Sequence, residues 1–324
     1  MYQKRIVERI LLAGVLVCQF CLSLDALAQE ERFPNRPIQV IVPWGTGSAA
    51  DITSRIVAPY VEKYFKQPFL VVNKPGGGAI LGTTMLAKAK PDGYTLGQIS
   101  SYFAGAFLFH DNLEFAADSF ESICGIVKVC AFFVVRADAP WKTLQEFVSE
   151  AKKNPGRLRY STQGFACAYH LAGTDFCGKA GIKLTHIPQP GVGDVISQLM
   201  GKHVEMGVVA TTLGHLPAGR LRALAVATEK RLEAFPAIPT MAELGYPVHC
   251  EIHTGHVVPR GTPKRIKEKL SRGYLESLRA NEKAFTAAFM KLDEFLAILE
   301  PDEYTEVTRR DTEAQMRYKG MKLE

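Results

Sequence analysis

The stretch Ile38-Gln-Val-Ile-Val-Pro-Trp-Gly-Thr-Gly-Ser-Ala-Ala-Asp51 decides the fold of this chain. It begins with a short β-branched run that stops at Pro43, which is typical of a buried strand. A glycine-containing turn follows, and the amphipathic stretch from Ile52 to Phe65 predicts a helix. A strand, a loop and a helix in this order predict a βαβ unit on a mainly parallel sheet.

The same order recurs along the chain. After the first unit we expect strands at 69–72 and 94–99 around a helix at 80–89. A second series has strand-like runs at 131–135, 158–161, 183–187, 203–209 and 221–227, with helices at 141–153 and from about 169. Residues 262–318 are charged, amphipathic and predicted to be largely helical, with Pro301 opening the last helix.

Composition sets the broad class. The chain has 324 residues, a formal charge of +6 and 47% hydrophobic residues, which predicts a globular protein of two domains. No Lys/Arg run is dense enough for a nucleic-acid groove, so we expect no nucleic-acid partner. We place the crossings between the domains near Cys130 and His253.

The first 28 residues have the pattern of a secretory signal. Three basic residues precede an apolar run from Ile10 to Leu24, which ends at Ala26-Leu-Ala28. The run is shorter than the roughly 20 apolar residues of a membrane span, so a cleaved signal is favoured over an anchor. Removing residues 1–28, with three bases, two acids and two of seven cysteines, would leave 296 residues, a charge of +5 and five cysteines.

The remaining cysteines have no metal-binding spacing. An exported protein can form disulfides, but an odd number leaves at least one thiol, and the sequence does not fix any pairing. They are Cys124, Cys130, Cys167, Cys177 and Cys250.

Two loops are candidates for anion binding. The loop Trp44–Asp51 has one charge, and Ser48-x-x-Asp51 matches a helix-opening box, so Asp51 is expected to act mainly as a cap. The exposed amides at this helix start can bind an anion without a basic side chain. The loop from Ser161 to His170 has small and hydroxyl side chains, no acid, no Lys and no Arg. Together they suggest a cleft that holds a carboxylate; the alternative is two ordinary turns.

Two alternatives concern other chemistry. The cluster His249-Cys-Glu-Ile-His-Thr-Gly-His256 resembles a metal site in composition, but its apolar residues favour a strand, on which His249 and His253 share a face and His256 does not. A fortuitous cluster is preferred and no metal is expected. Cys167 at a helix start, with His170 as base, would be a nucleophile of an enzyme, but we favour a packed thiol.

Several longer motifs resemble one family. These are 37–55, 72–82, 87–96, Asn154-Pro-Gly156, 219–226, 238–247 and Pro259-Arg-Gly-Thr-Pro263, in order along the chain. They are similar to the periplasmic substrate-binding proteins of tripartite tricarboxylate transporters, also called Bug proteins.

The resemblance implies a two-lobed, periplasmic-binding-protein-like α/β fold (type II, Venus flytrap), each lobe a mainly parallel sheet flanked by helices. Lobe 1 would comprise 29–130 and 253–324, and lobe 2 would comprise 131–252. It implies that the receptor closes on a small organic acid and delivers it to membrane permease subunits. We expect a periplasmic monomer that is not an enzyme and needs no cofactor. A receptor that presents its ligand to a sensory kinase is the alternative from another class.

The resemblance and the two loops assign ligand binding to one set of residues: Trp44, Gly45, Thr46, Gly47, Ser48, Asp51, Ser101, Ser161, Thr162, Gln163, Gly164, Ala166, Cys167, Gly191, Ala210 and Thr211. The sequence departs from the family in both loops. Trp44-Gly-Thr-Gly-Ser48 stands where Phe-Ala-Pro-Gly-Gly is common, and Ala166-Cys167 replaces a common Gly-Ser.

Overall fold

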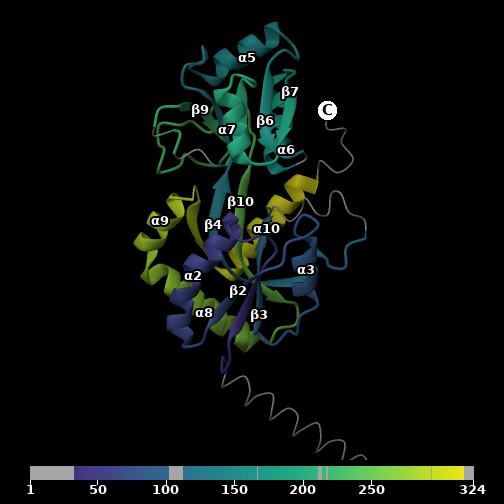
Figure 1. Ribbon diagram of the computed structural model, residues 1–324, viewed down its shortest axis with the longest axis vertical. Helices are drawn as coiled ribbons and strands as arrows, with labels where there is room; N and C mark the ends of the chain where they lie inside the picture. The colour runs from purple at the N-terminus through teal and green to yellow at the C-terminus, as the bar shows by residue number, and fades with distance from the viewer. Residues whose placement is uncertain are drawn as a thin grey trace, which may run out of the picture.

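The structure of the protein is a computed structural model that describes residues 33–101, 112–165, 167–210, 214–216, 218–292 and 294–316. The chain forms two α/β lobes flanked by helices, which confirms the predicted two-lobed fold class (Figure 1). The prediction that each sheet is mainly parallel is wrong, since each lobe has one mixed sheet in which antiparallel pairings are at least as numerous as parallel ones. The predicted signal segment 1–28 lies outside the described residues. No helix in the described part of the chain is long and apolar enough to cross a membrane.

Lobe 1 is built on a six-stranded sheet with the order β11-β4-β10-β3-β1-β2. β1, β2 and β3 are parallel, as the sequence predicts, whereas β10 is antiparallel to both β3 and β4, and β11 is antiparallel to β4. The sheet is therefore mixed, because two strands return from the last quarter of the chain. The strands are β1 Ile38–Val42, β2 Phe69–Asn73, β3 Thr95–Ser100, β4 Phe120–Cys130, β10 Glu251–Pro259 and β11 Phe295–Leu299.

Helices cover both faces of this sheet. Val40 points into the core beneath α2 and α8, while its neighbour Ile41 packs on the other face with Leu86 of α3 and Tyr304 of α10. This alternation is the period of two expected of a strand buried on both faces. The helices are α2 Ala49–Phe65, α3 Ile80–Ala87, α8 Lys264–Ala280, α9 Glu282–Met290 and α10 Pro301–Met316, with a short 3₁₀ turn, η2, at Ala117–Ser119.

Lobe 2 has a five-stranded sheet with the order β7-β6-β8-β5-β9. β6 is parallel to β7 and β8, and β5 is antiparallel to β8 and β9. Phe132 and Phe133 of β5 point to opposite faces, each into a separate apolar cluster. The elements are β5 Phe132–Arg136, α5 Leu144–Lys153, β6 Arg159–Gln163, α6 Ala168–Ala180, β7 Thr185–Gln189, α7 Val192–Met200, β8 Met206–Val209 and β9 Leu221–Val226.

The chain passes between the two sheets at two places. β4 ends at Cys130 and β5 begins at Phe132, and the return path leads from Cys250 into β10 (Figure 1). A backbone hydrogen bond joins the two crossings, from Ala131 N to Cys250 O at 3.0 Å. Cys250 N in turn donates to Ala227 O, just after β9, at 2.8 Å. The division of the chain into 29–130 with 253–324 and 131–252 stays a proposal.

The C-terminal region is largely helical, as predicted, but it includes one strand that the sequence pattern did not indicate. Residues 262–318 are not helical throughout, because Phe295–Leu299 forms β11 at the edge of the lobe 1 sheet. This five-residue apolar run is too short for a stable helix, and its pairing with β4 satisfies its backbone groups. Pro301 does open the last helix, at the position where its missing N–H costs no hydrogen bond.

Candidate functional site

Strand direction places the first predicted loop opposite lobe 2. β1 and β3 are parallel, and both β3 and β4 are antiparallel to β10, so β1, β3 and β4 run in one direction. β4 ends at Cys130, where the chain enters lobe 2. The carboxyl end of β1, with the loop 44–51 that follows it, therefore lies at the end of the lobe 1 sheet that faces lobe 2.

The same reasoning places the second loop opposite lobe 1. β5 begins beside lobe 1, and Phe132 at its start pairs with Val209 at the end of β8 and with Val226 at the end of β9. β6 is parallel to β8, so the loop 161–167 lies at this end of the lobe 2 sheet. Open α/β sheets bind ligands outside the carboxyl ends of their strands, and here two such ends face each other.

The first loop leads directly into α2. Ser48 caps the helix: its hydroxyl accepts a hydrogen bond from Asp51 N at 3.3 Å. The amides of Ala49 and Ala50, in the first turn, have no hydrogen-bond partner among the described residues. Unbonded N–H groups at the positive end of a helix dipole can donate hydrogen bonds to an anion, so this helix start has the chemistry of an anion site.

Asp51 is a structural residue of this loop. Its carboxylate accepts hydrogen bonds from Gly47 N and from Arg55 Nε, both at 2.9 Å, and is 2% exposed. Burial disfavours its charged form, but the hydrogen bonds from Gly47 and Asn73 and the charge of Arg55 hold its pKa below the usual value. The predicted capping role therefore fits the geometry, although the carboxylate reaches Gly47 N rather than the amide of Ser48.

Asn73 and Arg55 hold the first loop from outside it, and sequence reasoning missed both. Asn73 Nδ2 donates to Trp44 O at 3.0 Å, and Asn73 Oδ1 accepts from Thr46 Oγ1 at 3.3 Å and from Arg55 at 3.1 Å. A signal was present, since Asn73 ends the strand that neighbours β1. The guanidinium of Arg55 is thus bonded to Asp51 and Asn73.

Ser161 and Thr162, which the sequence placed in the second loop, lie at the end of β6 with their side chains turned inward. Ser161 Oγ donates to Ile187 O at 2.6 Å, and Thr162 Oγ1 lies 2.9 Å from both Gly164 O and His186 Nε2. Gly164 has φ of +104°, a conformation that glycine adopts without strain, and it lets the chain turn into α6. Gln163 and Gly164 are half-buried beside it.

Cys167 caps α6 and is not an activated nucleophile. Its Sγ accepts from the backbone N–H of His170 at 3.4 Å and lies 3.7 Å from Thr162 Oγ1. Burial raises the pKa of the thiol, which overrides the lowering that a helix start would produce. The His170 ring instead stacks on His186, with ring centroids 3.8 Å apart, so it is not positioned as a base for Cys167.

The other predicted site residues lie around the crossings. Ser101 follows β3 and is fully buried, and its hydroxyl accepts from His253 N at 3.1 Å. Gly191 caps α7 after β7, and Ala210 follows β8 and is buried. Ala166 and Thr211 lie outside the described residues.

The histidines near the second crossing do not form a metal site. His256 Nδ1 lies 2.9 Å from Tyr274 Oη and its Nε2 lies 3.2 Å from Ser54 Oγ, inside lobe 1. His253 Nδ1 contacts Asp311 at 3.2 Å, and His249 lies 3.5 Å from Glu251. Each imidazole has a different partner, and the described residues contain no group of three ligands suited to a metal.

The cysteines predicted to remain after signal cleavage are all free thiols in the structure. Burial raises the pKa of Cys124, Cys130 and Cys250, and it raises that of Cys177 to about 12. No disulfide joins any two of these five cysteines, whose pairing the sequence left open.

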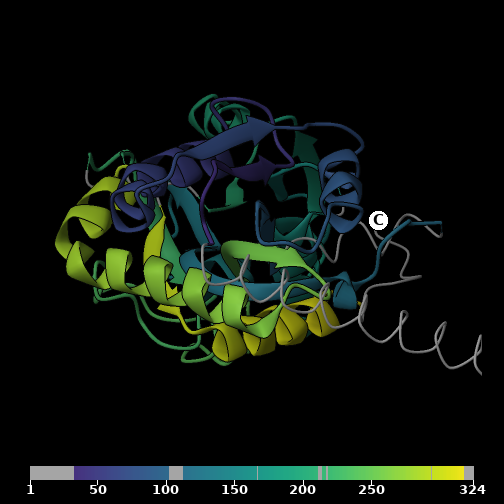
Figure 2. The ribbon, with the colours of Figure 1, turned by 90° about the horizontal axis from the view of Figure 1, so that it is seen from below.

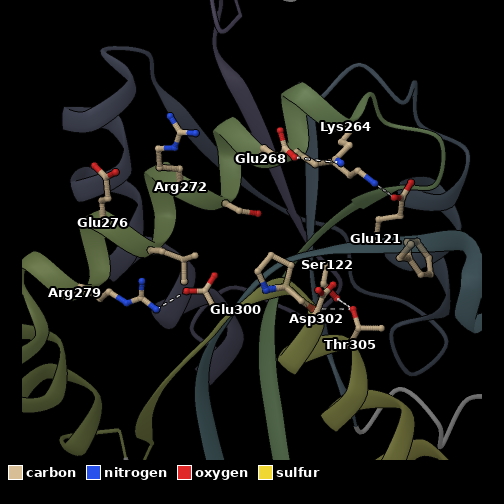
Figure 3. Close-up of a pocket in the computed structure, with 15 residues that line it drawn as sticks. Glu121, Ser122, Lys264, Glu268, Arg272, Glu276, Arg279, Glu300, Asp302 and Thr305 are labelled. Carbon is tan, nitrogen blue, oxygen red and sulfur yellow. Dashed lines mark hydrogen bonds and ion pairs between the residues drawn. The ribbon is translucent and has the colours of Figure 1, made fainter.

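A groove on lobe 1 lies at the far end of the sheet from these loops. α8 and α10 run side by side along it (Figure 2), and its volume is about 940 Å³. Its floor includes Phe120 and Ser122, at the end of β4 opposite the crossing. Several charges pair within the groove: Lys267 pairs with Glu121, and Arg279 pairs with Glu300 (Figure 3). It is separate from the two loops, and its lining has five acids and four bases, so it offers no net positive charge for an anion.

Two α/β lobes joined by two crossings, with the two predicted loops at their facing ends, are the architecture of a bilobal solute-binding protein. Residues 53–294 match the family described as Tripartite tricarboxylate transporter family receptor, TctC. The match spans more than half of the chain, so the protein belongs to the TctC family of solute-binding receptors. This is a family of binding proteins and not of enzymes.

Individual relatives agree with this assignment. Protein BugT of Bordetella pertussis is 30% identical over 304 residues, which cover 90% of this chain and 91% of BugT. A TctC solute binding protein from Polaromonas, solved with no ligand, has a TM-score of 0.77 at 28% identity, covering 87% of this chain and 97% of that one. These findings confirm the family predicted from the motifs.

A more distant structure supports the fold alone. The R. palustris protein Rpa4515, solved with adipate, has a TM-score of 0.74 at 22% identity. It covers 89% of this chain and 98% of its own.

Proposed function

We propose that this receptor captures a small organic carboxylate between its lobes, held by loops 44–51 and 161–167. The observation that carries the proposal is the pair of amides at Ala49 and Ala50, at the start of a 17-residue helix and at the end of lobe 1 that faces lobe 2. Backbone amides at a helix start bind carboxylates without a basic side chain. The family's name, which refers to tricarboxylate transport, supports the same class of ligand.

The proposal extends to the receptor's place in transport. The chain would be exported to the periplasm after cleavage at residue 28, act as a monomer, and hand its ligand to the permease subunits of a tripartite system. Support comes from the signal-like pattern of the first 28 residues and from the family match. The ligand set assigned from the sequence, including Ser101, Gly191 and Ala210, is part of this proposal.

Mass spectrometry of the protein purified without denaturation would test the ligand class. A retained carboxylic acid is the expected result. The purified protein would then be screened by thermal shift against mono-, di-, tri- and aromatic carboxylates. A ligand at 100 times its Kd stabilises the folded state by about 2.7 kcal/mol. A melting temperature that none of these acids changes would refute the carboxylate proposal.

Ala49→Pro would test the amide donors themselves. Proline suits the first position of a helix, and the preceding Ser48 is already extended, with φ −66° and ψ 156°, so α2 should be retained. The substitution removes one N–H donor to a charged group, which is worth about 1.5–3 kcal/mol. We expect Kd for the bound acid to rise roughly ten- to hundredfold. Ala49→Ser keeps the amide and is the matched control.

A further inference from the structure

The second loop carries an aromatic side chain at the proposed ligand site. Phe165, between β6 and α6, is 58% exposed, whereas the rings behind it are buried or half-buried. Its ring centroid lies 5.0 Å from that of His170, His170 stacks on His186 at 3.8 Å, and His186 lies 4.8 Å from Tyr160. Four rings thus form one pile that starts in the core of lobe 2 and ends with Phe165 at the surface.

The pile is uncharged at neutral pH. Burial lowers the pKa of His170 to about 4. Burial, together with the neighbouring His170, lowers the pKa of His186 to about 4 as well. Both imidazoles are therefore neutral, and the pile supplies an apolar aromatic face and no countercharge for an anion.

The loops also lack spare positive charge. Among their described residues there is no Lys or Arg, and Arg55, in α2 beside the first loop, is bonded to Asp51 and Asn73. Backbone amides can accommodate one carboxylate. A second or third carboxylate would find no charged partner among the described residues of either loop, and its desolvation there would be costly.

We propose that the ligand is an aromatic monocarboxylate whose carboxylate binds the loop amides and whose ring stacks on Phe165. This inference rests on the proposed function, since it names the chemical class of acid that the same site takes. Phe165 is then a specificity-determining residue, because it adds the ligand ring to the end of an existing aromatic pile. Trp44, half-buried on the first loop, is the aromatic side chain that lobe 1 contributes at the facing end.

The experiment is calorimetric titration of the purified protein, freed of bound ligand, with benzoate, cyclohexanecarboxylate, succinate and citrate. Benzoate and cyclohexanecarboxylate share the carboxylate and the ring size, and only benzoate is planar and aromatic. We expect benzoate to bind about three- to tenfold more tightly than cyclohexanecarboxylate, and succinate and citrate to bind more weakly than both.

Variants locate the effect. Phe165→Ala should raise Kd for benzoate about three- to tenfold and abolish the preference over cyclohexanecarboxylate. Leu70→Ala, which removes a side chain that is 52% exposed on β2, is the control and should leave Kd unchanged. Melting temperatures of both variants establish that they are folded.

The possible failures are distinguishable. If succinate or citrate binds more tightly than benzoate, or if Phe165→Ala leaves benzoate binding unchanged, the aromatic inference is overturned and the carboxylate proposal stands. If none of the four acids binds and no other carboxylate changes the melting temperature, the proposed function fails, and the inference fails with it.

Discussion

Replacing Glu294 by Gln should change how the stability of lobe 1 depends on pH. Glu294 is 5% exposed and accepts a hydrogen bond from Thr53 Oγ1 of α2. Burial raises the pKa of its carboxyl group to about 7, against an ordinary value of 4.5, although the bond from Thr53 opposes the shift. Gln has the shape of the protonated acid, keeps an acceptor for Thr53, and cannot ionise.

The magnitude follows from linkage. Between pH 4.5 and 7 the folded chain keeps the proton on Glu294 while the unfolded chain releases it. The raised pKa therefore contributes stability that is complete below pH 4.5 and is lost as pH rises through 7. Each pH unit in this interval costs about 1.4 kcal/mol, so the free energy of unfolding falls by about 3 kcal/mol and then levels off.

Urea unfolding from pH 4.5 to pH 8.5 would measure this effect. Relative to wild type, Glu294→Gln should gain about 3 kcal/mol across the range, with most of the change between pH 5 and 7. Glu233→Gln, at an exposed position, is the control and should follow wild type. If the curves of wild type and Glu294→Gln run parallel over the whole range, the reasoning about burial at this site is wrong.

Three other predictions concern the loops, the sheet and the thiols. Gly255→Ala should lower the free energy of unfolding by about 1–3 kcal/mol, since a Cβ there would lie 2.1 Å from the carbonyl oxygen of Cys124. Gly178→Ala, in α6 with open space around it, should instead raise it by up to about 1 kcal/mol; equal effects in urea unfolding would contradict this contrast. Asp51→Asn should cost about 1 kcal/mol at pH 7. The cost should shrink as pH falls below the ordinary value of 3.8, because the charged form of Asp51 is the stabilising one; a cost in thermal unfolding that is the same at pH 6 and at pH 3 would show another cause. For the chain that lacks residues 1–28, thiol titration at pH 8 should find five reactive thiols when the protein is unfolded in guanidinium. In the native state at most Cys177 should react, since it is the one cysteine of the five that is not fully buried; rapid native labelling of Cys167 would refute its assignment as a buried cap.

The sequence predicts the first hundred residues well for physical reasons. Short β-branched runs there stop at Pro or Gly, and an amphipathic period follows each loop, so local pattern and tertiary structure agree. β11 was missed because five apolar residues after a helical region carry no period of their own, and only pairing with β4 makes them a strand.

In the candidate site, too, the roles of residues that act locally could be predicted from the sequence, and those that depend on distant parts of the chain could not. Ser48 and Asp51 act over three or four residues, so spacing reveals their roles. Asn73 acts from another strand, and the burial that raises the pKa of Cys167 comes from packing over the whole lobe; neither is a local property. That the two loops face each other depends on the direction of β4 and β10, which composition and periodicity do not encode.

The pairing of those two crossing strands has a consequence for how the receptor opens. Cys130 pairs with Glu251, so the strands form a hydrogen-bonded ribbon up to the point where they leave lobe 1. Such a ribbon resists shear in its own plane and yields to bending and twist, which its register shifts at Thr254/Gly255 and His256/Val257 favour locally. Opening should therefore be a swing of one lobe rather than a sliding of the two loops past each other. Changes at these irregular positions would alter the width of the swing without touching the ligand loops, so release rate and selectivity can vary independently within this fold.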